Sequence, residues 1–165
     1  MSTNPKPTRV LFVCTGNICR SPMAEAVFAH MVAAAGLQEQ IAADSAGTGA
    51  WHVGEPPHPG TRGVLRERAI EYAHRARQVE SADFERFDYL IALDRGHLAD
   101  LQRLGRQSRA RIALLMDYAP AAGVRDVPDP YYTGGFAEVY DLVEQACRGL
   151  LAEIAGSHHR GETAP

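Results

Sequence analysis

Alternating apolar and amphipathic stretches along the chain predict an α/β fold. The residues from Val10 to Val13 are apolar at every position and mostly β-branched or aromatic, which is typical of a buried parallel strand. After a polar loop, apolar residues recur at helical spacing between Met23 and Ala34, and Gly36 offers an end to the pattern. The first part of the chain therefore predicts a strand, a loop and a helix.

The same alternation continues along the chain. Further strands are predicted at 40–46, 89–93 and 111–115, and further helices at 61–69, 96–104 and 136–155. Strands that alternate with helices are joined by right-handed crossovers, so the sheet should be parallel and covered by helices on both faces. We expect one α/β domain over residues 9–155 with a four-stranded parallel sheet, and flexible polar tails at 1–8 and 156–165.

The composition narrows the class of protein. A chain of 165 residues with 45% hydrophobic and 22% charged residues matches a single globular domain. Its 17 Lys and Arg against 20 Asp and Glu give a net charge of −3, without the basic excess that non-specific binding to nucleic acid or anionic membranes requires. The sequence shows neither a signal peptide nor a membrane span, so we expect a cytoplasmic protein with reduced cysteines.

The loop between the first strand and the first helix is the most informative segment. It reads Cys14-Thr15-Gly16-Asn17-Ile18-Cys19-Arg20-Ser21. The five residues between Cys14 and Arg20 allow the backbone N–H groups to surround one tetrahedral anion. The guanidinium group of Arg20 can bind two oxygens of that anion, and Gly16 and Asn17 tolerate the positive φ that a tight loop needs. The segment therefore predicts a phosphate-binding loop after the first strand.

Cys14 is the candidate nucleophile of this loop. The inward N–H groups, the start of the helix and Arg20 would each stabilise its thiolate, the form in which cysteine attacks. Ser21, followed by Pro22, is typical of a helix start, and its hydroxyl can both accept and donate. We expect Ser21 to cap the helix and to donate to the sulfur. The alternative is that Cys14 is a buried cysteine before a plain turn.

A candidate proton donor follows much later in the chain. Cleavage of a phosphate ester is helped when the leaving oxygen is protonated. Asp129 lies between two prolines that stiffen its loop, and two tyrosines follow. Asp-Pro alone is a common turn dipeptide, and Asp126 is a rival carboxylate without rigid flanks. We predict that Asp129 is the general acid.

These motifs together resemble those of the low-molecular-weight protein tyrosine phosphatases. The residues that carry the resemblance are the segment 13–25, Ser45-Ala46-Gly47-Thr48 and Asp129-Pro130-Tyr131-Tyr132, within a similarity that spans about 9–154. The resemblance implies that Cys14 forms a phosphocysteine, that Arg20 holds the phosphoryl oxygens, and that Asp129 protonates the leaving phenol and then activates water. It implies no metal and no other cofactor.

The resemblance also implies roles for other residues. Asn17, Ser45 and His74 would support the loop, and Asp94 would orient Arg20. Without the resemblance, His74 would be interpreted as a surface or core histidine, Ser45 as a hydroxyl at the end of a strand, and Asp94 as a helix cap. The proposed walls for a phosphotyrosine ring are Trp51, Tyr131 and Tyr132.

Cys19 has two readings. The resemblance implies a reversible disulfide between Cys19 and Cys14, and the alternative is a small side chain that fills space behind the loop. Two positions depart from common family usage: Ala69, where glycine often occurs, and Gly96-His97 after Asp94.

Other activities stay open. Arsenate reductases of this fold use two further cysteines near the third strand, whereas the range 72–117 contains none. Arginine phosphatases resemble the loop but tend to have Thr at the position of Ile18 and to lack the paired tyrosines. A phosphocysteine carrier or a phosphate-binding module would need no general acid. We expect a tyrosine phosphatase that acts on phosphotyrosine-containing proteins as a monomer or weak homo-oligomer, without nucleic-acid or membrane partners.

Overall fold

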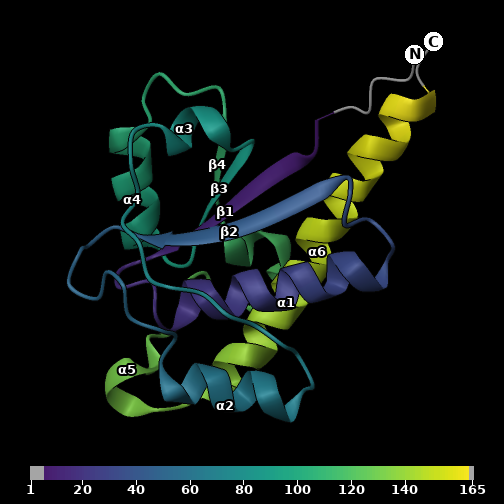
Figure 1. Ribbon diagram of the computed structural model, residues 1–165. Coiled ribbons are helices and arrows are strands. Elements are labelled where there is room, and N and C mark those ends of the chain that lie inside the picture. Colours follow the sequence, from purple (N-terminus) through teal and green to yellow (C-terminus); the bar gives the residue numbers. More distant parts are fainter. Residues whose placement is uncertain (1–5, 164–165) are drawn as a thin grey trace.

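The computed structural model describes residues 6–163, and side chains as far as residue 157. Within this range, a sheet of four parallel strands is covered by helices on both faces, which confirms the predicted α/β fold (Figure 1). The elements in chain order are β1 (Thr8–Cys14), α1 (Arg20–Ala34), β2 (Ile41–Gly47), α2 (Pro59–Glu67), α3 (Asp83–Arg86), β3 (Tyr89–Ala92), α4 (Arg95–Leu104), β4 (Arg111–Leu114), the 3-10 helices η1 (Leu115–Tyr118) and η2 (Pro120–Ala122), α5 (Pro130–Thr133) and α6 (Phe136–Thr163).

β1 lies in the middle of the sheet and is buried on both faces. Successive side chains of a strand point to opposite faces. Val10 and Phe12 belong to the core formed with α1 and α6, whereas Leu11 and Val13 belong to the core formed with α3 and α4. This is why four consecutive apolar residues are needed here, and why the strand could be recognised in the sequence.

The strand order places a binding site at the end of β1. The order is β2-β1-β3-β4, so the chain leaves β1 toward β2 on one side and later returns to β3 on the other. Open parallel sheets bind ligands at such a switch point, outside the carboxyl ends of the strands. The loop 15–19, which begins where Cys14 ends β1, lies at this position.

Gly47 brings β2 close to this loop. Gly47 pairs with Cys14 at the ends of the two strands. A Cβ atom at Gly47 would lie 2.6 Å from the carbonyl oxygen of Thr15 and 3.2 Å from the backbone nitrogen of Asn17. Both contacts are with backbone, which cannot easily give way, so a glycine is required for this approach.

Most predicted element ends agree with the structure to within two residues, but both domain ends need correction. Thr8, assigned to the N-terminal tail, belongs to β1, and residues 1–5 lie outside the described range. The predicted end of the last helix at 155, with a tail at 156–165, is wrong because α6 continues to Thr163. Glycine inside a helix costs only about 1 kcal/mol, and no proline follows Gly156 at close distance, so Gly156 does not end the helix. Residues 164–165 lie outside the described range.

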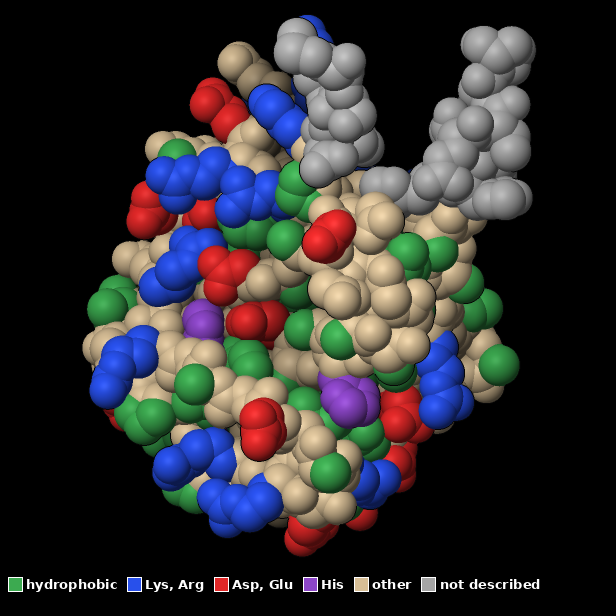
Figure 2. Space-filling model, turned by 45° about the vertical axis from the view of Figure 1, so that its right-hand side comes forward, with side chains coloured by type: hydrophobic (Ala, Val, Ile, Leu, Met, Phe, Trp, Pro, Cys, Tyr) green, Lys and Arg blue, Asp and Glu red, His purple; other side chains and the backbone are tan. Residues whose placement is uncertain are grey.

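The surface carries mixed charges. On the face drawn in Figure 2, basic and acidic side chains are interspersed, and no broad area of one sign stands out. This agrees with the small net charge of −3. Over the described part of the chain, no helix has both the length and the apolar character needed to cross a bilayer.

Candidate active site

The backbone of the loop after β1 leaves its N–H groups available for a ligand. Its carbonyl oxygens accept from neighbouring segments: Cys14 O from the N–H of Thr48 at 2.8 Å, Thr15 O from Gly49 at 2.9 Å, Ile18 O from His58 at 2.8 Å, and Cys19 O from the hydroxyl of Thr61 at 3.0 Å. By contrast, no backbone N–H group of residues 15–20 donates to an acceptor within residues 6–163. Free N–H groups beside the start of a long helix form an anion-binding site.

Asn17 holds the loop in shape. It adopts a positive φ of 56°, so the conformation predicted for Gly16 or Asn17 occurs at Asn17. Its Oδ1 accepts from the backbone N–H of Arg77 at 3.0 Å, which identifies that atom as the oxygen. Its Nδ2 therefore donates, to Ser21 Oγ at 2.9 Å and to Ser45 Oγ at 3.0 Å.

This polarity determines what Ser21 does. Because Ser21 Oγ accepts from Asn17, its own hydrogen is free to point toward the Sγ atom of Cys14, 2.9 Å away. The other acceptor within reach, the carbonyl oxygen of Ala46, is more distant at 3.5 Å. The expected cap is wrong: α1 begins at Arg20, so Ser21 lies inside the first turn, and Cys19 is the N-cap without a side-chain hydrogen bond.

Arg20 is buried beside the sulfur and held from two sides. Only 5% of Arg20 and 3% of Cys14 are exposed. One guanidinium nitrogen donates to Asp94 Oδ2 and to the carbonyl oxygen of Val127, each at 2.9 Å. The other lies 3.7 Å from Asp129 Oδ2. A buried guanidinium group with these partners is fixed in orientation and keeps its charge next to Cys14.

The contacts of Asp94 reconcile its two readings. Its Oδ1 accepts from the backbone N–H of His97 at 2.9 Å and caps α4, while its Oδ2 accepts from Arg20. One carboxylate therefore caps a helix and holds the guanidinium group at the same time. Asp126, the rival carboxylate, is instead paired with Arg95, whose side-chain nitrogens lie 3.0–3.3 Å from its oxygens.

The three cysteines differ in their surroundings. All are free thiols. Burial, with a contribution from the nearby Cys14, raises the pKa of Cys19 to about 12, so Cys19 is a neutral thiol that does not compete as a nucleophile. Cys147 lies on α6 and is fully buried in the core, where burial also raises its pKa. Of the three cysteines, Cys14 at the end of β1 is therefore the candidate nucleophile.

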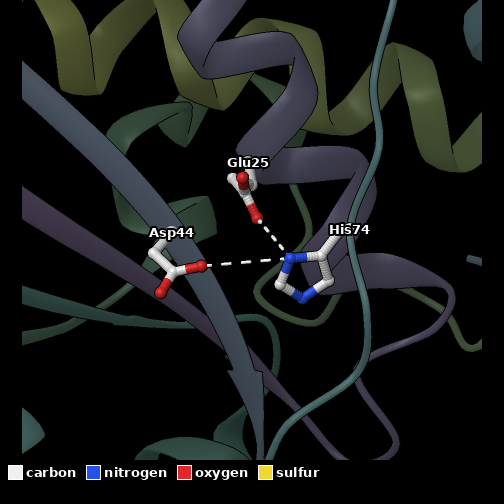
Figure 3. A group of neighbouring side chains, drawn as sticks. All are labelled: Glu25, Asp44 and His74. Carbon is white, nitrogen blue, oxygen red and sulfur yellow. Dashed lines mark ion pairs between the residues drawn. The ribbon is translucent and has the colours of Figure 1, made fainter. Parts of the chain in front are cut away.

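His74 joins the loop to a small group of charged side chains. Its Nε2 lies 2.8 Å from Asn17 Oδ1, which is an acceptor, so Nε2 carries the hydrogen. Figure 3 shows Glu25 on α1, Asp44 on β2 and His74 on the segment after α2 pointing toward one another. His74 Nδ1 lies 3.6 Å from Glu25 Oε1 and 4.0 Å from Asp44 Oδ1. Burial lowers the pKa of His74, which favours its neutral form.

The same group is the place where a metal ion could be considered. Within the described residues, Glu25, Asp44 and His74 are the histidine, cysteine and acidic side chains close enough together to share an ion. However, Glu25 Oε1 already accepts from the hydroxyls of Ser45 and Tyr72, each at 2.7 Å. The Asp44 carboxylate is likewise engaged by Arg77 at 3.1 Å, so protein donors already satisfy these oxygens.

A pocket of about 480 Å³ opens above the sulfur. Aromatic side chains stand at its mouth, and three of them are exposed: Trp51 by 78%, Tyr131 by 43% and Tyr132 by 84%. Exposed aromatic rings around a concave site are available to stack on a planar ligand. The residues that line the pocket are Cys14, Thr15, Gly16, Ile18, Cys19, Arg20, Trp51, His52, Asp129, Tyr131 and Tyr132.

Comparison with known proteins identifies the family. The family model described as low molecular weight phosphotyrosine protein phosphatase matches residues 9–160. The chain belongs to this family. Its members at high identity are enzymes, so this protein is a phosphatase.

Individual relatives of the phosphatase agree along most of their length. The low molecular weight protein-tyrosine-phosphatase of Streptomyces coelicolor is 53% identical over 152 residues, which cover 88% of this chain and 93% of the relative. YfkJ of Bacillus subtilis, another low molecular weight protein-tyrosine-phosphatase, is 50% identical over 147 residues, which cover 88% of this chain and 94% of YfkJ. The crystal structure of YfkJ matches with a TM-score of 0.90 and 46% identity. The match covers 94% of this chain and 99% of that one. The crystal structure of DARP, a Drosophila arginine phosphatase, matches with a TM-score of 0.84 and 34% identity. The match covers 88% of this chain and 96% of that one.

The structure also adds residues that the sequence did not reveal. Glu25 lies one helical turn after Ser21 on the same face of α1, a spacing that could have linked it to the loop. No spacing in the sequence indicates that Tyr72 or His52 lies near the site. The contact between Thr15 and His97 could not be predicted either, because these residues are 82 positions apart in the chain. The structure brings each of these residues to the loop or to its supporting groups.

Proposed function

We propose that this phosphatase hydrolyses phosphotyrosine in proteins through a phosphocysteine intermediate on Cys14. The observation that supports this most directly is the surroundings of the Cys14 sulfur. It lies at the base of a loop whose backbone N–H groups have no acceptor among residues 6–163, 2.9 Å from a hydroxyl that can donate to it, beside a buried guanidinium group. All three favour negative charge on sulfur and on a bound phosphate.

In the first step, the thiolate of Cys14 attacks phosphorus as the bond from phosphorus to the phenol oxygen breaks. The loop N–H groups and Arg20 bind the three non-bridging oxygens, where negative charge is held in the transition state. The electron pair of the broken bond moves to the phenol oxygen, and Asp129, which lines the pocket and enters this step as the protonated carboxylic acid, gives its proton to that oxygen.

In the second step, water replaces the sulfur. Asp129, now a carboxylate, accepts a proton from the water as its oxygen attacks phosphorus. The sulfur leaves with the electron pair of the sulfur–phosphorus bond, and the hydrogen bond from Ser21 stabilises the returning thiolate. Inorganic phosphate is released, and the starting state is restored.

The substrate preference follows from the mouth of the pocket. The rings of Tyr131 and Tyr132 pack edge to face with centroids 4.9 Å apart, and Trp51 stands exposed on the other loop that lines the site. A phenyl ring held between aromatic side chains gains dispersion and edge interactions that an aliphatic phosphoserine cannot make. This supports phosphotyrosine as the substrate.

The same site acts within one chain. Every residue named in the two steps comes from a single protomer, so we propose that the phosphatase is active as a monomer. A thiolate nucleophile also requires reducing conditions, which supports a cytoplasmic location.

The test is turnover of matched peptides that carry phosphotyrosine, phosphoserine or phosphoarginine. We expect fastest release from phosphotyrosine, loss of turnover in Cys14→Ser, and a large loss in Asp129→Ala. Faster release from phosphoarginine would replace the proposed substrate with that of an arginine phosphatase. A single stoichiometric burst without turnover in the wild type would indicate a phosphocysteine carrier.

A further inference from the structure

His97 is a buried titratable side chain that links two parts of the site. It is the third residue of α4 and is only 4% exposed. Its Nε2 lies 2.7 Å from the hydroxyl oxygen of Thr15 in the phosphate-binding loop. Its Nδ1 lies 3.0 Å from Asp94 Oδ1, on the carboxylate that holds Arg20. The imidazole ring therefore bridges the loop and the carboxylate behind the guanidinium group.

The carboxylate of Asp94 determines which ring nitrogen carries the hydrogen. A carboxylate only accepts, so a lone pair on Nδ1 would face the lone pairs of Asp94 Oδ1 at 3.0 Å and be repelled. The neutral ring therefore carries its hydrogen on Nδ1. This contact lies off the line of a good hydrogen bond, and Nδ1 has no hydrogen-bond partner among the described residues, so the effect is mainly electrostatic.

The tautomer in turn orients Thr15. With its hydrogen on Nδ1, the neutral ring presents the lone pair of Nε2, so the Thr15 hydroxyl must donate to it across 2.7 Å. The Thr15 hydrogen then points away from the pocket, toward His97. The side chain that follows the nucleophile is thereby held in one orientation.

We propose that neutral His97 is a positioning residue of the phosphate-binding loop, and that its protonation lowers activity on the acidic side of neutrality. The inference rests on the phosphatase function proposed above. Histidine is suited to such a role because small changes in its surroundings move its charge across the physiological range of pH.

Protonation would reverse the contact with Thr15. Both nitrogens of the imidazolium ring donate, so Thr15 could no longer donate to Nε2 and its hydrogen would have to turn elsewhere. The new positive charge would also compete with Arg20 for Asp94, since both cations would face the same carboxylate. Both changes disturb groups that we assign to phosphate binding.

The charges around His97 act in both directions. Asp94 at the cap of α4, Asp100 on that helix and Asp129 before α5 favour the imidazolium ion, whereas Arg20 on α1 opposes it. Burial is the largest effect, and together these influences lower the pKa of His97 below its ordinary value. The ring is therefore neutral at pH 7, and the change is expected below the ordinary histidine value of about 6.5.

The kinetic test compares kcat/KM for p-nitrophenyl phosphate in the wild type and in His97→Gln. Glutamine retains a polar group of similar reach but does not titrate. We expect the ratio of variant to wild-type kcat/KM to rise by roughly threefold between pH 7 and about pH 5. The matched control is His30→Gln, an exposed histidine on α1, which should leave the ratio constant.

The second readout does not depend on activity or on the variant. Nitrogen NMR of the wild-type imidazole should show hydrogen on Nδ1 and a bare Nε2 near neutral pH, with titration over the same range as the kinetic change. Thr15→Val, which removes the donor, should change the Nε2 signal, whereas Thr15→Ser should restore it.

The outcomes separate the two proposals. Wild-type turnover with a ratio that stays constant with pH would overturn the role of His97 and leave the phosphatase function intact. Hydrogen on Nε2 in the neutral ring would overturn it as well, even if His97→Gln failed to fold. Absence of wild-type turnover would overturn the function itself, while the tautomer could still be measured.

Discussion

The Sγ atom of Cys14 lies 2.9 Å from the Oγ atom of Ser21, and the direction of this contact is set outside the loop. The backbone N–H of Arg77 occupies Asn17 Oδ1, which turns Nδ2 of Asn17 toward Ser21. Ser21 accepts there, which leaves its hydrogen for the sulfur. A backbone group on a distant segment thus orients the hydroxyl that stabilises the nucleophile.

Replacement of Ser21 by alanine tests this chain of donors. Ser21→Ala removes the hydrogen bond to sulfur, so we expect kcat to fall by roughly tenfold to a hundredfold, because the thiolate is a poorer leaving group in the second step. Alkylation of Cys14 followed as a function of pH should show less thiolate at neutral pH. Ser108→Ala, remote from the pocket, serves as the control. An unchanged alkylation profile in Ser21→Ala would count against the role of the hydroxyl.

Replacement of Asp94 by asparagine separates its two contacts. Asparagine caps helices as well as aspartate does, but it has one oxygen where the carboxylate has two. With that oxygen at the cap, its NH₂ group would face Arg20. We expect kcat/KM to fall by about tenfold or more with little change in Tm, whereas Asp94→Ala should lower both. Equal loss of Tm in the two variants would show that the cap, and not the contact with Arg20, is what matters.

The residue that ends α2 has backbone strain that a glycine substitution should relieve. Ala69 adopts a positive φ of 57° where the helix ends, and Ile70 donates to the carbonyl of Leu65 in the way typical of a glycine-terminated helix. Because this conformation costs a non-glycine residue about 1–2 kcal/mol, Ala69→Gly should raise the free energy of unfolding by about 1 kcal/mol. Denaturant unfolding measures the change.

The matched control for Ala69 is the corresponding position after α1. Gly36 has a φ of 72°, and a Cβ atom there would meet nothing within 4 Å. Gly36→Ala should therefore lower stability by a similar amount through backbone strain alone. Stabilisation by both substitutions, or by neither, would contradict this explanation.

Burial of His97 predicts how stability depends on pH. The pKa of His97 is lowered in the folded protein, so the folded state binds fewer protons than the unfolded state. This contribution to stability is present above the unfolded value of about 6.5 and is lost as the pH falls below it. We expect Tm to fall less between pH 7 and about pH 5 in His97→Gln than in the wild type. Parallel curves for the two proteins would show that His97 is protonated without cost.

The sequence was sufficient where the relevant residues are neighbours. Cys14, Arg20 and the residues between them form one continuous loop, so their spacing already indicated an anion site. Gly36 ends α1 as expected because it can adopt a positive φ. Gly156 looked equally like an end, yet α6 continues, because a single glycine costs less than the packing and hydrogen bonds of a long helix supply.

Contacts made across the sheet could not be derived in this way. Thr15 follows β1 and His97 lies just after β3, and only the pairing of these two strands brings the side chains together. The roles of Ser21 and Asp94 were ambiguous for another reason: each side chain has more than one hydrogen-bonding site, and its partners depend on where the helix begins. The predicted contact of Ser21 with sulfur is present, but its predicted cap is not, because α1 begins at Arg20, before Ser21.

The most direct measurement of the proposed chemistry is recovery of the phosphoryl group on Cys14. Asp129→Ala should still react with p-nitrophenyl phosphate, because p-nitrophenolate leaves without a proton, but it should lack the base for the second step. We expect a burst of p-nitrophenolate equal to the amount of enzyme, with the phosphoryl group on the peptide that contains Cys14 after rapid quenching. A burst with the phosphoryl group on another residue, or turnover that persists in Cys14→Ser, would contradict the mechanism.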